Sequence, residues 1–294
     1  MLDGRHSYNI IKSMTNSAKN PNADPPSNIQ IMGILNVTPD SFSDGGKFAA
    51  VDRAVEHALQ MIDDGADIID VGPESTRPGS QLVPDQEQTR RGIPAIKAIR
   101  ANNSSVAISI DTQSAQVAEA ALDAGADIVN DISALRNDPK MASLVAGRKC
   151  RVVLMHMQGT PKTMQNNPTY NDVVKEGIAF LQERCDVAAH AGIDSNDIIV
   201  DPGIGFGKST AHNLTIMRRL GEYQSLGVPV LLGVSRKRFL DEITPGKTQP
   251  DQRLAASLAC VAQAIQTGVQ FLRVHDVAET RQFVTATQAI NTQN

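Results

Sequence analysis

The chain has 294 residues, of which 41% are hydrophobic, and a formal net charge of −4. This length and apolar content are enough for a sizeable core in one large domain or two small ones. The weakly negative charge, with a pI near 5.9, gives no general reason to expect nucleic-acid binding. No apolar run approaches the ~20 residues of a membrane span, which argues against an integral membrane protein.

The first 28 residues differ in composition from the rest. They are rich in Asn, Ser, Lys and Pro, have little apolar periodicity and lack the apolar core of a signal peptide. We therefore predict a flexible extension over residues 1–28 and a single domain over residues 29–294. The three cysteines, Cys150, Cys185 and Cys260, have neither metal nor disulfide spacing, which favours free thiols in a reducing cytoplasm.

The segment IMGILNVTPDSFSDGG, residues 31–46, joins an apolar run to a polar loop. Residues 31–35 keep no helical period and are mostly apolar, which predicts a buried strand. Asn36 ends that strand, and the Thr, Pro, Asp, Ser and Gly residues after it favour turns. Polar loops in this position often carry the chemistry of α/β proteins.

Short apolar runs alternate with longer amphipathic segments from residue 29 onward. The predicted strands span residues 31–35, 67–71, 106–110, 127–129, 151–155, 198–200, 229–234 and 270–274. The predicted helices span residues 50–64, 85–100, 114–124, 139–146, 171–191, 211–226, 254–267 and 276–290. Six helices are followed by a glycine where a left-handed C-cap is expected, at Gly65, Gly125, Gly147, Gly192, Gly227 and Gly268.

Eight β-α units favour a (β/α)₈ TIM barrel, which typically has ~250 residues. The alternative is a doubly wound open sheet. That fold normally shows a G-x-G-x-x-G turn after its first strand, and NVTPDSFSDGG occupies this place here. We therefore predict the barrel.

Polar residues stand at or beside the C-terminal end of every predicted strand. They are Asn36, Asp70, Asp111, Asn130 with Asp131, His156, Asp201, Ser235 and His275. In a barrel these positions meet on one face, where active sites are built. Some of them could instead cap the next helix, and we assign such structural roles to Asp70 and Asp131.

Cationic residues follow the last two predicted strands. Arg236, Lys237 and Arg238 follow the seventh, and Arg273 lies in the eighth. Loops after these two strands often bind phosphate in barrels. We interpret Arg236 as a solvated helix start, whereas Arg273 lies inside an apolar run and would be costly there without a partner.

Side chains at the ends of middle strands indicate a different ligand group. Asp111, Asn130 and Asp201 would point into the barrel, and their oxygens suit a neutral heterocycle with N–H edges. The glycine-rich segment 201–209 fails as a Walker A motif because Pro202 stands where the first glycine is needed. The histidines lack zinc-site spacing.

Several motifs together resemble dihydropteroate synthase, the folate-pathway enzyme that sulfonamides inhibit. They are MGILNVTPDSFSDGG, ESTRPGS, ISIDT, VNDIS, VVLMHMQGTP, DPGIGFGK, SRKRF and RVHDV, in that order. The resemblance implies a pterin-binding TIM barrel, usually a homodimer. It also implies a reaction that joins a hydroxymethyl-dihydropterin diphosphate to 4-aminobenzoate, giving dihydropteroate and diphosphate.

The resemblance implies roles for residues at matching positions. The pterin would be bound by Asp111, Asn130, Met155, Asp201, Phe206 and Lys237. The diphosphate would be bound by Asn36, Thr76, Arg77, Arg273 and His275, with Asn36 also a ligand of Mg²⁺. The 4-aminobenzoate would be bound by Phe42, Pro78, Lys237 and Arg238. The implied catalytic residues are Asp40, Arg77, Lys237, Arg273 and His275.

The family mechanism needs no activated nucleophile. Diphosphate departs first or nearly so, and the aromatic amine attacks the methylene cation that remains. Catalysis is then mostly positioning and charge neutralisation on the leaving group.

The sequence departs from the family pattern at two positions. Pro73 stands where glycine is frequent, and Arg238 stands where several members have serine. We expect the backbone N–H at this helix start, with Arg238, to bind the aminobenzoate carboxylate.

Other functions remain open to a pterin-binding barrel. One is a methyltetrahydrofolate:corrinoid methyltransferase, and another is a non-catalytic pterin-binding protein. The loops NVTPDSFSDGG and STRPG argue against both. A generic phosphate-binding lyase or isomerase should have a lysine deep in the barrel, and Lys237 is the one candidate.

Overall fold

A computed structural model of the chain describes residues 29–37, 47–75, 80 and 82–291, without the side chains of residues 47–50. The predicted extension over residues 1–28 lies outside the described residues and stays a prediction. No helix in the described part is long and apolar enough to cross a membrane. The three cysteines, which are all described, are buried free thiols as predicted.

Eight parallel strands form one sheet in the order β6-β5-β4-β3-β2-β1-β8-β7. Their bounds are β1 Gln30–Asn36, β2 Ile68–Gly72, β3 Ala107–Asp111, β4 Ile128–Asp131, β5 Arg151–Met155, β6 Ile198–Asp201, β7 Leu231–Leu232 and β8 Phe271–Val274. The two outer strands meet through a parallel bridge between Val200 and Val230, and the Val200 N–H donates to the carbonyl of Pro229 at 2.9 Å. The predicted barrel is confirmed, and the open doubly wound sheet was wrong.

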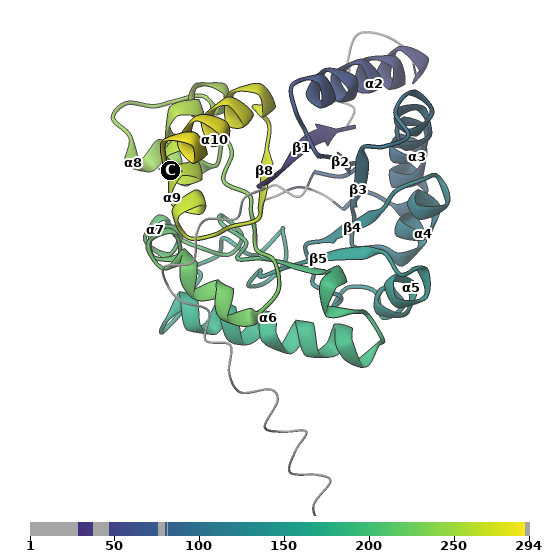
Figure 1. Cartoon of the computed structure of the whole chain (residues 1–294). Helices are drawn as coiled ribbons and strands as arrows, with labels where there is room; N and C mark the ends of the chain where they lie inside the picture. The colour runs from purple at the N-terminus through teal and green to yellow at the C-terminus, as the bar shows by residue number, and fades with distance from the viewer. Residues whose placement is uncertain (1–28, 38–46, 76–79, 81, 292–294) are drawn as a thin grey trace, which may run out of the picture.

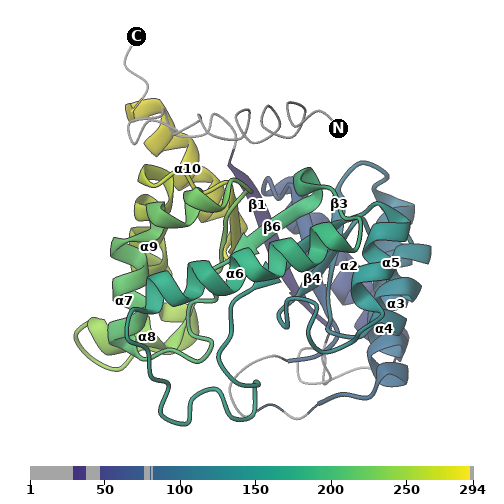
Figure 2. The same ribbon diagram turned by 90° about the horizontal axis from the view of Figure 1, so that it is seen from below.

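Helices surround these strands in chain order (Figure 1). They are α2 Lys47–Asp63, α3 Asp85–Asn102, α4 Ala115–Asp123, α5 Met141–Arg148, α6 Val173–His190, α7 Thr210–Arg218, α8 Arg238–Ile243, α9 Leu254–Gln266 and α10 Val277–Asn291. Figure 2 shows α6 lying across the front, with α7 and α9 to one side and α3, α4 and α5 to the other.

Most differences from the predicted elements fall near β7. The predicted helix 211–226 divides into α7 and a 3₁₀ helix, Leu220–Leu226, which buries Tyr223 completely. The predicted strand 229–234 shortens to Leu231–Leu232, and the six-residue α8 was not predicted because it is too short to show a period.

One of the predicted helix caps was wrong. Gly147 lies inside α5, and Lys149 takes the left-handed conformation after it with φ of 51°. The other predicted glycine caps, Gly65, Gly125, Gly192, Gly227 and Gly268, all have positive φ.

Two apolar regions hold the barrel together. The larger lies between strands and helices, where Ile69, Ile96 and Ile108 are fully buried. The smaller fills the barrel interior with side chains from seven of the strands: Met32, Ile68, Ile128, Val153, Ile199, Leu231 and Phe271. This interior layer closes the barrel below its C-terminal face, so that no channel passes through it.

Gly203 in the segment after β6 should be far less tolerant of substitution than Gly227. Both have positive φ, but a Cβ on Gly203 would overlap the carbonyl oxygen of His156, whereas nothing lies within 4 Å of a Cβ on Gly227. We expect Gly227→Ala to lower the free energy of unfolding by about 1 kcal/mol, from the left-handed backbone alone. Gly203→Ala should cost at least about 2 kcal/mol more because the clash is with backbone. Equal losses in urea unfolding would contradict this packing.

Candidate active site

A polar layer lies two residues beyond the apolar interior layer on most strands. Because side chains alternate along a strand, residues two apart face the same side of the barrel. Ile68 is thus followed by Asp70, and Ile128 by Asn130. The polar residues at this level are Asp70, Asp111, Asn130, Asp201 and Arg273, and Met155 and Gly233 stand at the same level. Predicted binding residues from five strands are therefore brought together above the core.

Arg273 is held between two carboxylates in this layer. Its Nε donates to Asp70 Oδ2 at 2.7 Å, and its Nη2 contacts Asp111 Oδ2 at 2.8 Å. The Asn130 amide also points at Asp70, with Nδ2 3.3 Å from Oδ2. Asp70 is completely buried. Our expectation that an unpaired Arg273 would be too costly is confirmed, and Asp70 supports two predicted site residues.

Burial and neighbouring charges shift the pKa values of this cluster in opposite directions. Burial raises the pKa of Asp111 to about 7, although the charge of Arg273 lowers it. For Arg273, burial lowers the pKa, but Asp70 and Asp111 outweigh it and raise the pKa above its ordinary value. Arg273 therefore stays charged. The second oxygen of Asp111, Oδ1, is buried without a hydrogen-bond partner among the described residues, so it is available to a ligand donor.

Lys237 and Asp201 form the opposite side of the layer. The Lys237 ammonium hydrogen-bonds the carbonyl oxygen of Ile204 and lies 4.7 Å from the centre of the Phe206 ring. Burial lowers the pKa of Lys237 to about 8, against the effect of Asp201. Asp201 Oδ1 accepts the Gly203 N–H at 2.7 Å, and burial raises its pKa.

Apolar side chains line the C-terminal opening of the barrel, here called the barrel mouth, near Asp201. Met155 packs with Ile132, Met157 and Met164, and Phe206 lies against this cluster. A flat ring could stack here while its edge meets the carboxylates.

Asn36 and His275 lie at the ends of β1 and β8. Both the backbone N–H of His275, at 3.2 Å, and its Nδ1, at 3.0 Å, contact the Ser235 hydroxyl. No hydrogen bond within the described chain occupies the Asn36 side-chain amide.

Some strand-end residues do not join the layer. His156 packs against Phe180, with ring centroids 5.0 Å apart, and burial lowers its pKa to about 2. Asp131 instead accepts backbone N–H groups of Ser133 and Leu135, so the structural role predicted for it is confirmed. The expectation that the strand-end side chains converge was wrong for His156.

The cationic residues after β7 have different surroundings in the structure. Arg236 forms a two-point ion pair with Asp276 and is half-buried, so its interpretation as a solvated helix start was wrong. The side chain of Arg238 is 87% exposed and pairs with Glu242 at 3.0 Å. The predicted residues Asp40, Phe42, Thr76, Arg77 and Pro78 lie outside the described residues.

Lys208 was missed by the sequence analysis. It is 3% exposed, and its ammonium donates to the carbonyl oxygens of His156 and Phe206. Burial lowers its pKa to about 7. Its signal in the sequence is its place at the end of the DPGIGFGK motif, in which the resemblance implies roles only for Asp201 and Phe206.

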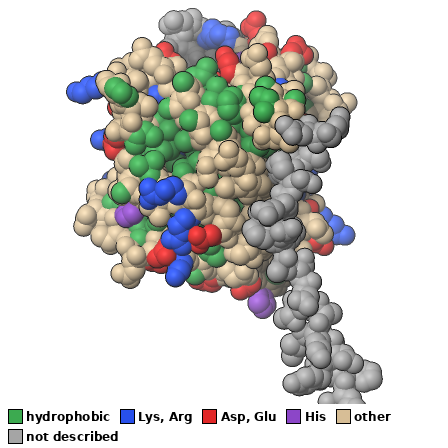
Figure 3. Space-filling model, turned by 60° about the vertical axis from the view of Figure 1, so that its left-hand side comes forward, with side chains coloured by type: hydrophobic (Ala, Val, Ile, Leu, Met, Phe, Trp, Pro, Cys, Tyr) green, Lys and Arg blue, Asp and Glu red, His purple; other side chains and the backbone are tan. Residues whose placement is uncertain are grey.

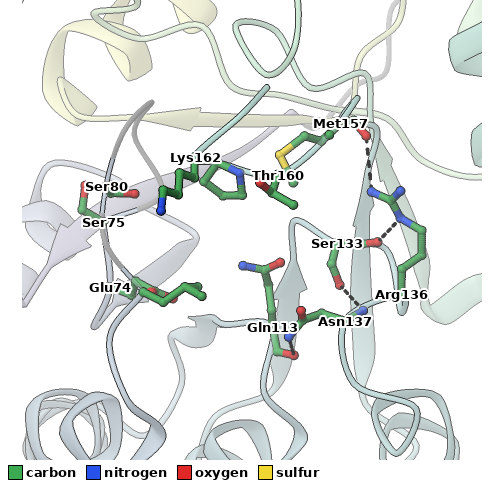
Figure 4. A pocket seen from close by; sticks show the side chains of 13 residues that line it. Glu74, Ser75, Ser80, Gln113, Ser133, Arg136, Asn137, Met157, Thr160 and Lys162 are labelled. Atoms are coloured by element: carbon green, nitrogen blue, oxygen red, sulfur yellow. Dashed lines mark hydrogen bonds between the residues drawn. The ribbon is translucent and has the colours of Figure 1, made fainter. Parts of the chain in front are cut away.

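A cavity of about 650 Å³ opens beside the layer, between the segments that follow β2, β3, β4 and β5. Figure 4 shows Lys162 extending toward Ser75 and Ser80, with Gln113 and Ser133 on other walls. None of the predicted site residues that the structure describes lines it. The polar layer and this cavity are therefore separate features at the same end of the barrel.

Comparisons with known proteins agree with this arrangement. The family model described as "Pterin binding enzyme" matches residues 32–275. Dihydropteroate synthase of Bacillus subtilis is 47% identical over 251 residues, covering 85% of this chain and 84% of the relative.

Solved structures agree as well. Dihydropteroate synthase of Xanthomonas albilineans with 4-aminobenzoic acid has a TM-score of 0.85 and 46% identity, covering 91% of this chain and 95% of the other. The same protein in complex with 7,8-dihydropteroate has a TM-score of 0.82 and 44% identity, with the same coverage. The chain therefore belongs to the dihydropteroate synthase family of pterin-binding enzymes.

Proposed function

We propose that this protein condenses (7,8-dihydropterin-6-yl)methyl diphosphate with 4-aminobenzoate. The methylene C–O bond breaks, and diphosphate leaves with the bonding electrons. The aromatic amine then forms the new C–N bond and loses one proton, which gives 7,8-dihydropteroate. Structures of one relative, with 4-aminobenzoic acid and in complex with 7,8-dihydropteroate, support this choice.

The observation that carries the proposal is the free acceptor in the polar layer. Asp111 Oδ1 is buried and lacks a partner among the described residues, and Asp201 lies across the same mouth. A pterin presents N–H donors along one edge, so two carboxylates satisfy that edge without any water. Asn130 adds an amide, and Lys237 adds a cation beside the ring.

The leaving group would be received by cations at β8. Arg273 is charged and 21% exposed, so part of its guanidinium remains open to the mouth. His275 would contact the same group. Charge neutralisation of this kind is usually the largest contribution to such a reaction.

Asn36 fits a role as a ligand of Mg²⁺. Its amide is not engaged by other described residues, and magnesium prefers oxygen ligands while keeping waters and substrate phosphates as its other partners. The described residues hold no group of three acidic, His or Cys side chains that could cage a metal. One amide oxygen suits an ion that arrives with the diphosphate, where it would offset the charge of the departing group.

The protein's other contributions are positioning and exclusion of water. Met155 and Phe206 would hold the pterin ring in place, and Lys237 with Arg238 would receive the aminobenzoate. Water competes with the amine for a methylene cation, so a dry pocket raises the yield of product. Asp40, Phe42, Thr76, Arg77 and Pro78 keep the roles that the resemblance implies.

We further propose a homodimer formed through α9 and its neighbours. The outer side of α9 carries Leu254, Ala255, Leu258, Ala259 and Ala262, none of which is fully buried. Figure 3 shows hydrophobic side chains gathered on the face that includes this part of the molecule. An apolar patch of this kind on a water-exposed helix is typical of a subunit interface. The buried free thiols accord with a cytoplasmic location.

One assay tests the reaction. Purified protein should release diphosphate from the pterin substrate only when both 4-aminobenzoate and Mg²⁺ are present. A corrinoid methyltransferase or a non-catalytic pterin-binding protein would release none. Pterin binding by folded protein without any such release would refute the synthase proposal.

Arg273→Ala should slow turnover by roughly 10²-fold or more, as for loss of one charge contact in a transition state. It also leaves Asp70 and Asp111 without their shared cation, so unfolding should be measured in parallel. Arg218→Ala, at an exposed position on α7, is the control and should leave kcat unchanged. An unchanged kcat in Arg273→Ala would refute its role.

Leu258→Glu should convert the dimer to a monomer because a charge cannot be buried unpaired in an apolar interface. Sedimentation velocity would measure the mass of each form. Gln116→Glu, at an exposed position on α4, is the matched control and should stay dimeric. A wild-type protein that sediments as a monomer would contradict the proposed dimer.

A further inference from the structure

Lys208 bridges two segments at the barrel mouth. Its Nζ donates to the carbonyl oxygen of His156 at 3.2 Å, after β5, and to that of Phe206 at 3.0 Å, after β6. The side chain is 3% exposed. No described carboxylate forms an ion pair with this ammonium. A buried cation without a direct ion pair is costly, which calls for a reason beyond packing.

The two segments that Lys208 joins are in backbone contact. A Cβ on Gly207 would lie 2.6 Å from the carbonyl oxygen of Gln158, and one on Gly203 would overlap that of His156. The Gly207 carbonyl accepts the Tyr170 hydroxyl at 2.8 Å, and the Gly205 N–H donates to Asn213 at 2.9 Å. The segment after β6 is therefore held by hydrogen bonds along its length, and the buried Lys208 side chain adds two more.

Phe206 connects Lys208 to the proposed pterin site. Its carbonyl is held by Lys208, while its ring faces the Lys237 ammonium at 4.7 Å. The Ile204 carbonyl, two residues earlier, accepts a hydrogen bond from Lys237. By binding the Phe206 carbonyl, Lys208 therefore fixes the backbone that carries both contacts of Lys237, the Ile204 carbonyl and the Phe206 ring.

The charge of Lys208 also acts on Asp201. Burial raises the pKa of the Asp201 carboxyl, and the charges of Lys237, Lys208 and Arg273 lower it. The other titratable groups near Lys208 are His156 and His212. The pKa of each is lowered first by burial and then by the charge of Lys208. When it is protonated, Lys208 supplies one of three cations that stabilise the Asp201 carboxylate.

We propose that Lys208 is a positioning residue for the pterin: it holds Phe206 against the substrate ring and stabilises the Asp201 carboxylate that accepts the ring's N–H groups. It acts through these two residues and does not contact the substrate. The inference rests on the proposed synthase function.

Two variants separate the two effects. Lys208→Met removes both the charge and the hydrogen bonds, whereas Lys208→Gln keeps an amide donor without the charge. Lys175→Met, at an exposed position on α6, is the control. Steady-state kinetics with both substrates and the pH profile of kcat/KM for the pterin substrate are measured on each protein.

Lys208→Met should raise KM for the pterin substrate about tenfold, as for the loss of a buried charged donor, with a much smaller change for 4-aminobenzoate. In both Lys208 variants the acid limb of the kcat/KM profile should move to higher pH by about half a unit or more. The sign follows because loss of a nearby positive charge raises the pKa of Asp201, so that its carboxylate is protonated at a higher pH.

A purely structural role would lower the unfolding temperature and leave both the pH profile and the ratio of the two KM values unchanged. That result in Lys208→Gln would overturn the proposal even if Lys208→Met failed to fold. If wild-type protein shows no reaction, the synthase proposal fails first. If wild type reacts and the variants match it, only the inference on Lys208 fails.

Discussion

The ion pair cluster of Arg273 with Asp70 and Asp111 is the interaction on which the polar layer depends. Three ionisable side chains are buried directly above an apolar core, and each is tolerable there only because the others are present. Removing Arg273 would leave two buried carboxylates facing each other. Removing either carboxylate would weaken the orientation of the guanidinium, which faces the barrel mouth. The cluster therefore supports the site and also supplies its chemistry.

The two-residue repeat of the strands explains why this cluster lies where it does. Most strands contribute one apolar side chain to the interior layer and, two residues later, one residue to the polar layer. A shift of one residue in any strand would place its polar residue among the surrounding helices. The fold and the site are thus specified by the same alternation.

Much of this arrangement could be predicted from the sequence. Local patterns were sufficient for the eight strands, for most helices and for placing Asp111, Asn130 and Asp201 near one another, because strand ends in a barrel share one face. The motif resemblance added specific roles, and the comparisons confirm the family. Those roles themselves remain proposals, as does the use of Mg²⁺.

Long-range partners could not be predicted in this way. Asp70 looked like a structural residue because its contacts, Arg273 and Asn130, are distant in sequence. His156 turns away from the mouth because aromatic residues of α6 and the segment before it offer a buried packing site. Lys208 contacts backbone carbonyls, which no side-chain pattern reveals. Near β7 the chain uses short elements, which have too few residues to show a period.

A crystal structure with the pterin substrate or a pterin analogue would test the central claim most directly. The account predicts a pterin ring between Met155 and Phe206, with its N–H edge on the carboxylates of Asp111 and Asp201. It also predicts the guanidinium of Arg273 next to the position of the diphosphate. A pterin bound instead in the neighbouring cavity, against Gln113 and Lys162, would contradict it.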